Sequence, residues 1–210
     1  MVAAVGTVGA VVVALFLPDW QRAKLRPVVN LSFDSITDDI ALHDRPPWVG
    51  VWIRFRVHNK EGRETVRKVR VVVSKVESLT ELRIPGDTLA FRELSWAEIS
   101  IGELDIPAGM ERRVDVVHVD KGRKATEAGV RPWPGLGLGL AMWPRLYDGR
   151  DYLGEGRFLI RLAVAGDNFD ASEWETYVSF DKTELSEQSS LEEIRKALVV
   201  SSPTLISRRK

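Results

Sequence analysis

The chain has 210 residues, enough for one large domain or two small ones. Apolar residues make up 44% and charged residues 29%, which is usual for a chain that folds around a packed core. The formal net charge of zero argues against nucleic-acid binding, and the absence of cysteine excludes disulfides, thiolate nucleophiles and cysteine-ligated zinc.

The amino-terminal segment is an uncharged apolar run. From Val2 to Leu17 the only polar side chain is Thr7, and the run ends at a proline and an aspartate, with Trp20 directly after them. A helix of this length lies at the lower limit of a membrane span, and Trp is favoured at the membrane interface. We therefore predict a transmembrane anchor over residues 1–20. The alternatives are a cleaved or vestigial export signal and a buried element.

Basic residues follow the run and none precedes it. Arg22, Lys24 and Arg26 lie in a short juxtamembrane segment, residues 21–26. Because Lys and Arg stay on the cytoplasmic side of a membrane, they predict a single-pass protein whose carboxy-terminal domain faces the cytoplasm. An export signal would need a basic segment before the apolar run. An extracytoplasmic domain is the alternative.

The first half of the body alternates apolar and polar residues, which is typical of half-buried strands. The pattern predicts a first strand after Pro27, a loop over the acidic, proline-bounded segment 34–47, and a pair of strands joined by a turn at residues 59–63. The alternating apolar residues are Val29, Leu31 and Phe33 in the first strand; Val51, Ile53, Phe55 and Val57 in the second; and Val69, Val71 and Val73 in the third.

The middle of the body predicts shorter strands within residues 89–96 and 99–106, and a longer one over residues 113–119. In the longer strand the alternation slips between Val116 and Val117, which indicates a β-bulge. The later segments 158–164 and 174–180 alternate cleanly and predict a hairpin.

Together these patterns predict a mainly β protein with about seven antiparallel strands in two packed sheets. The predicted sandwich spans residues 27–182, with an insertion at 121–154. A short carboxy-terminal helix is expected within residues 183–200, from Glu187 to Val200, before a flexible tail at 201–210.

Three stretches resemble bacterial immunoglobulin-like domains, including fibronectin-III-like and cell-adhesion-related modules. They are VWIRFRVHNKEGRETVRKVRVVV, GELDIPAGMERRVDV and GRFLIRLAVAGDN, which together cover about half of residues 27–182. The insertion and the terminal helix depart from the pattern of that family. The resemblance implies an immunoglobulin-like β-sandwich and a binding or scaffolding role rather than an enzyme.

The insertion holds aromatic residues among glycines and prolines, a composition suited to partner contact. These candidate partner-binding residues are Trp133, Trp143, Tyr147 and Tyr152. The alternative is that the rings cap one end of the sandwich, with Leu136, Leu138 and Leu140 forming an extra strand.

Four basic residues, Arg54, Arg56, Lys68 and Arg70, share the outward parity of the two strands expected to pair. They predict a positive sheet face, which is either an ordinary solvated surface or a face that attracts anionic lipid headgroups.

The sequence offers no metal, cofactor or catalytic motif that we can identify. His43, His58 and His118 lack zinc-ligand spacing, and the acidic clusters at residues 34–39 and 167–170 fit turn chemistry better than a calcium loop. The phosphate loop of nucleotide-binding proteins and the nucleophile elbow of hydrolases are both absent.

We therefore expect a non-enzymatic, membrane-tethered binding domain with an unknown protein partner and no cofactor. One alternative is a structural accessory subunit of a membrane complex. The other is an enzyme whose site lies in the Trp-rich insertion.

Overall fold

The structure is a computed structural model that describes residues 21, 23–36, 39–45, 48–80, 92–97, 102–121, 136–143 and 152–208. The predicted anchor at residues 1–20 lies outside the described residues. Within the described part, no helix has the length and apolar character needed to cross a bilayer.

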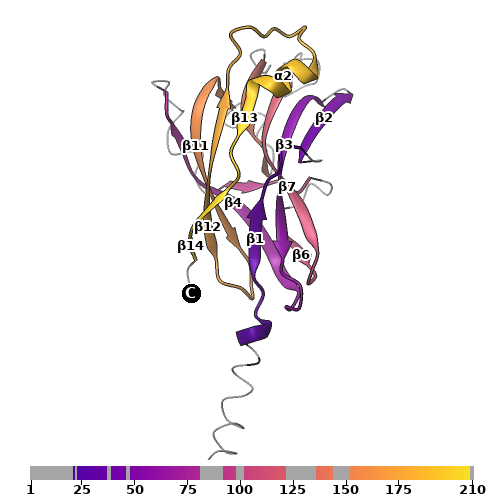
Figure 1. Cartoon of the computed structure of the whole chain (residues 1–210), viewed down its shortest axis with the longest axis vertical. Coiled ribbons are helices and arrows are strands. Elements are labelled where there is room, and N and C mark those ends of the chain that lie inside the picture. The colour runs from indigo at the N-terminus through magenta and orange to yellow at the C-terminus, as the bar shows by residue number, and fades with distance from the viewer. Residues whose placement is uncertain are drawn as a thin grey trace, which may run out of the picture.

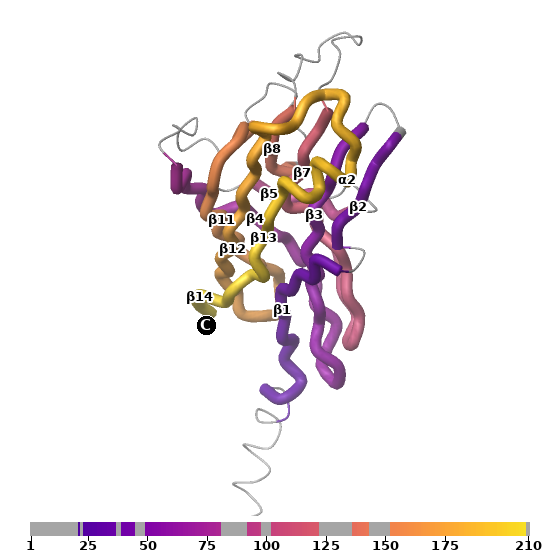
Figure 2. The backbone as a smooth tube through the Cα atoms, turned by 45° about the horizontal axis from the view of Figure 1, so that its top comes forward, coloured from indigo at the N-terminus to yellow at the C-terminus, as the bar shows by residue number. Residues whose placement is uncertain are grey.

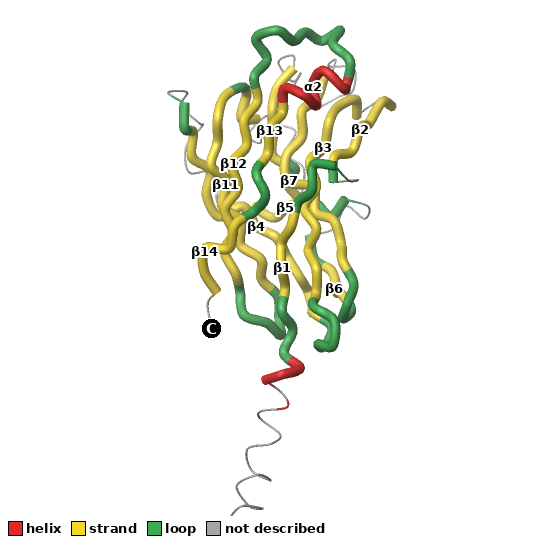
Figure 3. The backbone as a smooth tube through the Cα atoms, in the orientation of Figure 1, coloured by secondary structure: helices red, strands yellow, loops and turns green. Residues whose placement is uncertain are grey.

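The chain is mainly β and forms two antiparallel sheets packed as a sandwich, with the short helix α2 (Leu191–Ala197) at the top of the view and helical residues 23–25 at the bottom (Figure 1, Figure 3). One sheet is six-stranded, in the order β1-β3-β7-β8-β10, with β2 also paired to β3. Its strands are β1 (Val29–Ser32), β2 (Ile40–Arg45), β3 (Trp48–Asn59), β7 (Glu111–Lys121), β8 (Leu136–Leu140) and β10 (Tyr152–Gly154).

The other sheet is eight-stranded, in the order β13-β12-β11-β4-β5-β9, with β14 paired to β12 and β6 paired to β4. Its strands are β4 (Val66–Ser78), β5 (Arg92–Leu94), β6 (Leu104–Ile106), β9 (Met142–Trp143), β11 (Gly156–Ala165), β12 (Ser172–Phe180), β13 (Leu198–Val200) and β14 (Thr204–Arg208). The helix α2 (Leu191–Ala197) precedes β13.

The core lies between the two sheets and is built from the alternating apolar residues of both. Phe55 of β3, Phe158 of β11 and Phe180 of β12 are essentially fully buried there, as is Trp96. Each such side chain contributes about 2–3 kcal/mol of hydrophobic stabilisation. The predicted two-sheet antiparallel architecture is confirmed at this level. The prediction of about seven strands is too low, because the described residues form fourteen, many of them short edge strands that a local pattern does not show.

Several local predictions are confirmed by the register of the strands. The bulge lies at Val116, because Ile53 pairs with Val117 while the next residue, Arg54, pairs with Asp115. The hairpin near the carboxyl end is β11 and β12, paired continuously from Gly156 to Val164.

The predicted pairing of residues 51–57 with residues 69–73 is wrong. The first segment is part of β3, in the six-stranded sheet, and the second is part of β4, in the eight-stranded sheet. The turn between them therefore carries the chain across the sandwich. This arrangement lets both apolar faces point into the same core from opposite sides.

The predicted loop at residues 34–47 contains a strand, β2, paired with β3 from Ile40 to Arg45. Leu42 is 41% exposed, so this edge strand buries little apolar surface. Its second half, His43 to Arg45, is polar, and the alternation of apolar and polar residues is therefore hard to see in the sequence.

The carboxy-terminal predictions also need correction. The helix begins at Leu191, after the capping residue Ser190, and ends at Ala197. Residues 198–200 are strand β13, in which two consecutive valines favour extended backbone. The predicted flexible tail contains β14, whose residues 204–208 pair with β12.

This carboxy-terminal segment lies beside β1, and its last strand ends near the amino-terminal end of β1 (Figure 1, Figure 2). Ser202 Oγ donates to the Phe33 carbonyl at 3.3 Å, and Arg208 Nη2 donates to Asn30 Oδ1 at 3.1 Å. Side-chain hydrogen bonds therefore link the neighbouring edges of the two sheets.

Candidate functional site

The outer face of the six-stranded sheet carries a buried aromatic pair. Trp52 of β3 and His118 of β7 are direct cross-strand neighbours, and their rings stack at 4.4 Å with an interplanar angle of 17°. Each residue is only 3% exposed, yet neither belongs to the core between the sheets. The two rings form a second buried site on the opposite face of β3 and β7.

Polar and aromatic groups surround this pair. His118 Nε2 lies 3.4 Å from Asp120 Oδ2, and His43 of β2 meets the Trp52 ring edge-on at 5.9 Å. The Tyr152 ring covers the backbone of Gly137, where a side chain would collide with it. The histidine and the carboxylate are both buried on this face.

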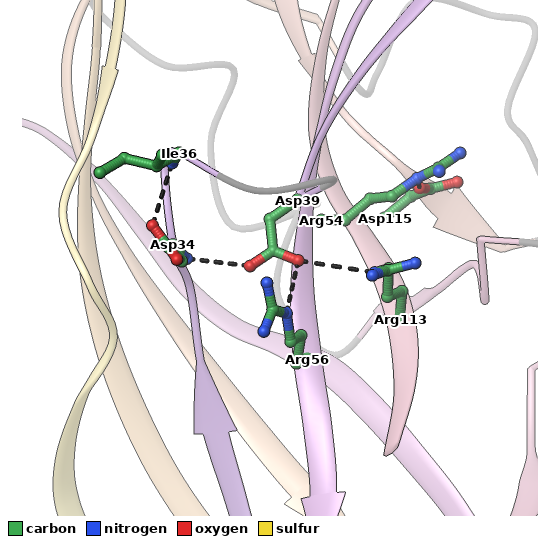
Figure 4. Close-up of polar contacts among 7 residues, drawn as sticks. All are labelled: Asp34, Ile36, Asp39, Arg54, Arg56, Arg113 and Asp115. Carbon is green, nitrogen blue, oxygen red and sulfur yellow. Dashed lines mark hydrogen bonds and ion pairs between the residues drawn. The ribbon is translucent and has the colours of Figure 1, made fainter.

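A charged network lies on the same outer face (Figure 4). The Asp39 carboxylate is fully buried and accepts from Arg56 Nε at 2.8 Å, with Arg113 Nε at 3.5 Å on its other side. Its second oxygen accepts from the backbone N–H of Asp34 at 2.9 Å. The carboxylate therefore ties the segment before β2 to strands β3 and β7.

Electrostatics within the network favour the charged form of Arg56. The hydrogen bond to Asp39 raises the pKa of Arg56 above its ordinary value. Burial lowers this pKa, but the negative charge of Asp39 also raises it, and the net shift is upward. Beside it, Arg54 Nε donates to Asp115 Oδ1 at 3.0 Å, and both side chains are mostly buried. These are structural ion pairs between neighbouring strands.

Sequence reasoning placed Asp39 in a turn and did not anticipate this network. The acidic segment at residues 34–39 gave no sign of it, because the partners of Asp39 come from strands distant in sequence. The sequence signal for it is the outward parity of Arg56, a cation whose side chain is mostly buried on that face.

The four basic residues predicted to share a face do not do so. Arg54 and Arg56 belong to the six-stranded sheet, while Lys68 and Arg70 belong to the eight-stranded sheet. Lys68 pairs with Asp167 at 3.3 Å, and Arg70 approaches Glu93 at 3.5 Å and Glu103 at 3.9 Å. The proposed lipid-facing surface of these four residues rested on the wrong strand pairing.

The predicted aromatic residues of the insertion are only partly described. Trp133 and Tyr147 lie outside the described residues. Trp143 belongs to β9 and Tyr152 to β10, which are strands of different sheets. The alternative of an extra strand at residues 136–140 is confirmed as β8, whose leucines are all buried. Within the described residues, no three His, Cys, Asp or Glu side chains are placed to hold a metal ion.

A shallow groove of about 390 Å³ lies on the eight-stranded sheet, where β11, β12 and β13 run side by side. Three large hydrophobic residues on its rim are strongly exposed: Leu79 at 52%, Tyr177 at 51% and Val199 at 62%. Arg157 adds a cation to the lining. The sequence contained the signal, because Tyr177 alternates with the inward-facing Thr176 and Val178.

The geometry of the groove is fixed by backbone and side-chain bonds between β12 and the residue after β13. The N–H of Ser201 donates to the Tyr177 carbonyl at 2.9 Å, and the Tyr177 N–H donates to Ser201 Oγ at 2.9 Å. The Tyr177 hydroxyl donates to Glu175 Oε1 at 3.4 Å. Tyr177, whose exposed side chain lines the groove, is therefore part of a hydrogen-bonded sheet rather than a loop.

A comparison with family models, with curated proteins and with solved structures found no match for this chain.

Proposed function

We propose that this chain is a non-enzymatic binding domain, tethered to a membrane by residues 1–20, whose partner is another protein. The observation that carries the proposal is the apolar groove beside Tyr177. Exposed hydrophobic patches on a rigid surface are characteristic of protein interaction sites, and Tyr is enriched at their energetic centres.

The occupant that fits the groove is an exposed segment of a protein carrying an apolar side chain. Leu79, Tyr177 and Val199 are each about half exposed, because the groove is shallow and open to solvent. A molecule bound there would contact the protein on one side and solvent on the other. Small-molecule sites usually enclose most of their ligand. The cation of Arg157 offers a polar contact at the edge, as in the polar rim of protein interfaces.

We also propose that the sandwich is a variant of the immunoglobulin-like fold. In such domains, strands A, B and E share one sheet while C, F and G share the other. The neighbours β1, β3 and β7 correspond to A, B and E, and β4, β11 and β12 to C, F and G. Strand β8 departs from this pattern. It lies beside β7 in the position of strand D, but strand D precedes strand E in the chain, whereas β8 follows β7.

The domain is proposed to face the cytoplasm. This orientation is supported by Arg22, Lys24 and Arg26, which directly follow the apolar run.

Site-specific photo-crosslinking tests the binding role. A photo-crosslinking phenylalanine derivative is placed at Tyr177 of the full chain, in the cells that produce it. The expected result is one discrete protein adduct that disappears when Val199→Asp is introduced. An apolar side chain bound in the groove would remove water from the new carboxylate, and this desolvation cost would weaken binding.

Leu42 supplies the matched control, since it is also exposed but lies on β2 of the other sheet. The same derivative at Leu42 should give no such adduct. An adduct of equal yield at both positions, or no adduct at Tyr177, would count against the groove as the binding surface.

A further inference from the structure

Three turns and the start of the chain meet at one end of the sandwich, which we call the basal end. It consists of residues 23–28, the β3–β4 turn 60–65, the β6–β7 turn 107–110 and the β11–β12 turn 166–171, at the bottom of the view (Figure 1, Figure 3). We include in it the adjoining residues Arg67 and Lys68 at the start of β4 and Arg208 at the end of β14. It is the end from which the chain continues toward the apolar run of residues 2–17.

Hydrogen bonds and an ion pair hold the chain start against these turns. The N–H of Lys60 donates to the Val28 carbonyl at 3.1 Å, and the N–H of Glu64 donates to the Leu25 carbonyl at 2.9 Å. Arg26 Nη1 lies 3.2 Å from Asp170 Oδ1. The domain is therefore positioned relative to residues 23–28 by defined contacts.

The turns are also bonded to one another. The N–H of Gly109 donates to the Asn59 carbonyl at 2.9 Å, and Asn168 Nδ2 donates to the Thr65 carbonyl at 2.9 Å. A surface that is connected in this way can meet a partner as one unit.

Basic residues near both ends of the described chain lie at this end. They are Lys24 and Arg26 in segment 23–28, and Arg208, which bonds Asn30 of β1. The segment 59–68 adds four cations against two carboxylates, and the turn 166–171 adds the carboxylates Asp167 and Asp170. Over these segments and Arg208, seven cations face four carboxylates, and the excess comes from parts of the chain that are far apart in the sequence.

Some of these cations have no acidic partner. Arg26 and Lys68 pair with Asp170 and Asp167. Within the described residues, Lys60 and Arg67 make no ion pair, and Arg208 bonds the neutral amide of Asn30. Lys60, Arg67 and Arg208 are all exposed, so their charges are available to an external anion.

We propose that the basal end is a membrane-contact surface that docks on anionic lipid headgroups. The inference rests on the proposed tethering and adds a defined orientation to it. Basic residues next to a membrane-inserted segment are attracted to anionic leaflets. Leu25 and Met110, 46% and 45% exposed at the same end, can enter the apolar boundary of the interface.

The test measures the distance of the basal end from the lipid surface. The full chain is reconstituted in phosphatidylcholine vesicles with or without phosphatidylglycerol. Because the chain contains no cysteine, Glu61→Cys in the basal β3–β4 turn supplies a single thiol for a fluorescent dye. A quencher attached to lipid headgroups then reports contact. Gln188→Cys, exposed at the opposite end, is the matched position.

The proposal predicts stronger quenching of the basal dye when phosphatidylglycerol is present, and no such gain at position 188. The triple variant Lys60→Gln, Arg67→Gln, Arg208→Gln should lower the docked-to-undocked ratio about a hundredfold, the product of about fivefold for each cation near the surface. The control variant Lys75→Gln, Lys182→Gln, Lys196→Gln removes the same charge away from the basal end and should leave the gain intact.

Equal quenching in the two lipid mixtures would overturn the docking surface and leave the tethering intact. So would an equal loss in the control variant, since net charge rather than position would then be responsible. A chain that alkaline washing removes from the vesicles would instead overturn the tethering itself.

Discussion

At the scale of single residues, Asp39 is the side chain on which the outer face of the six-stranded sheet depends. Its carboxylate is fully buried, while Arg56 and Arg113 beside it keep about a quarter of their side-chain surface exposed. Removing one member of a buried ion pair is costly because the remaining charge loses its partner. Here the removal of one carboxylate leaves two guanidinium groups adjacent.

Asp39→Asn is therefore expected to lower the free energy of unfolding by about 3 kcal/mol. Urea denaturation of the full chain measures this cost. Glu175→Gln removes a carboxylate from a more exposed arginine pair, Arg161–Glu175, and should cost at most about 1 kcal/mol. Equal costs for the two variants would contradict a central role for Asp39.

The sequence could show that Arg56 points out of the core, but not what it meets there. The alternation of residues within a strand shows on which face of the sheet a side chain lies. Whether that face is buried depends on other segments of the chain that pack against it. The same reasoning applies to His118. Its position on a strand was predicted, but its stacking on Trp52 follows from the register of β3 against β7, which the bulge at Val116 sets.

At the scale of elements, the short helix α2 depends on its amino-terminal cap. Ser190 and Glu193 form a capping box, in which the N–H of Ser190 donates to the Glu193 carboxylate at 2.6 Å. This bond and the one from the Ser190 hydroxyl lower the pKa of Glu193 from its ordinary value of 4.5. Ile194, fully buried, couples the helix to the core.

A pH profile of stability tests this cap. A lowered pKa means that the ionised form stabilises the folded state above about pH 4.5, and that this contribution is lost as the pH falls through the lower folded-state value. Wild type should therefore be more stable than Glu193→Gln at neutral pH, and the difference should shrink on acidification through this range.

Glu192→Gln is the control at the neighbouring position, where the carboxylate contacts Arg195 instead of the helix end. Its stability difference should be smaller at neutral pH. A Glu193→Gln difference that is constant across the acidic range would contradict the role of the charge in the cap.

Element boundaries were predicted well where one face is buried and poorly at the edges. Strands β3, β11 and β12 alternate cleanly because one side faces the core. Strand β2 and strand β14 lie at sheet edges with exposed apolar residues, so their periodicity is weak. The separation of β3 from β4 depends on contacts across the sandwich, which a local pattern does not contain.

At the scale of the whole molecule, the sandwich presents two different surfaces. The basal end carries unpaired cations beside the start of the chain, while the groove lies on the eight-stranded sheet between β12 and β13. A domain docked by its basal end would keep the groove open to a partner, since the groove is on a sheet face rather than at that end. Tethering and partner binding are therefore compatible in one orientation.

The most direct test of this account is a protease-protection experiment on intact cells that produce the full chain with a carboxy-terminal tag, together with alkaline washing of their membranes. We predict that the chain stays with the washed membranes and that the tagged domain resists external protease until the cells are permeabilised. Release by alkaline washing would contradict the tether, and digestion in intact cells would contradict the cytoplasmic orientation.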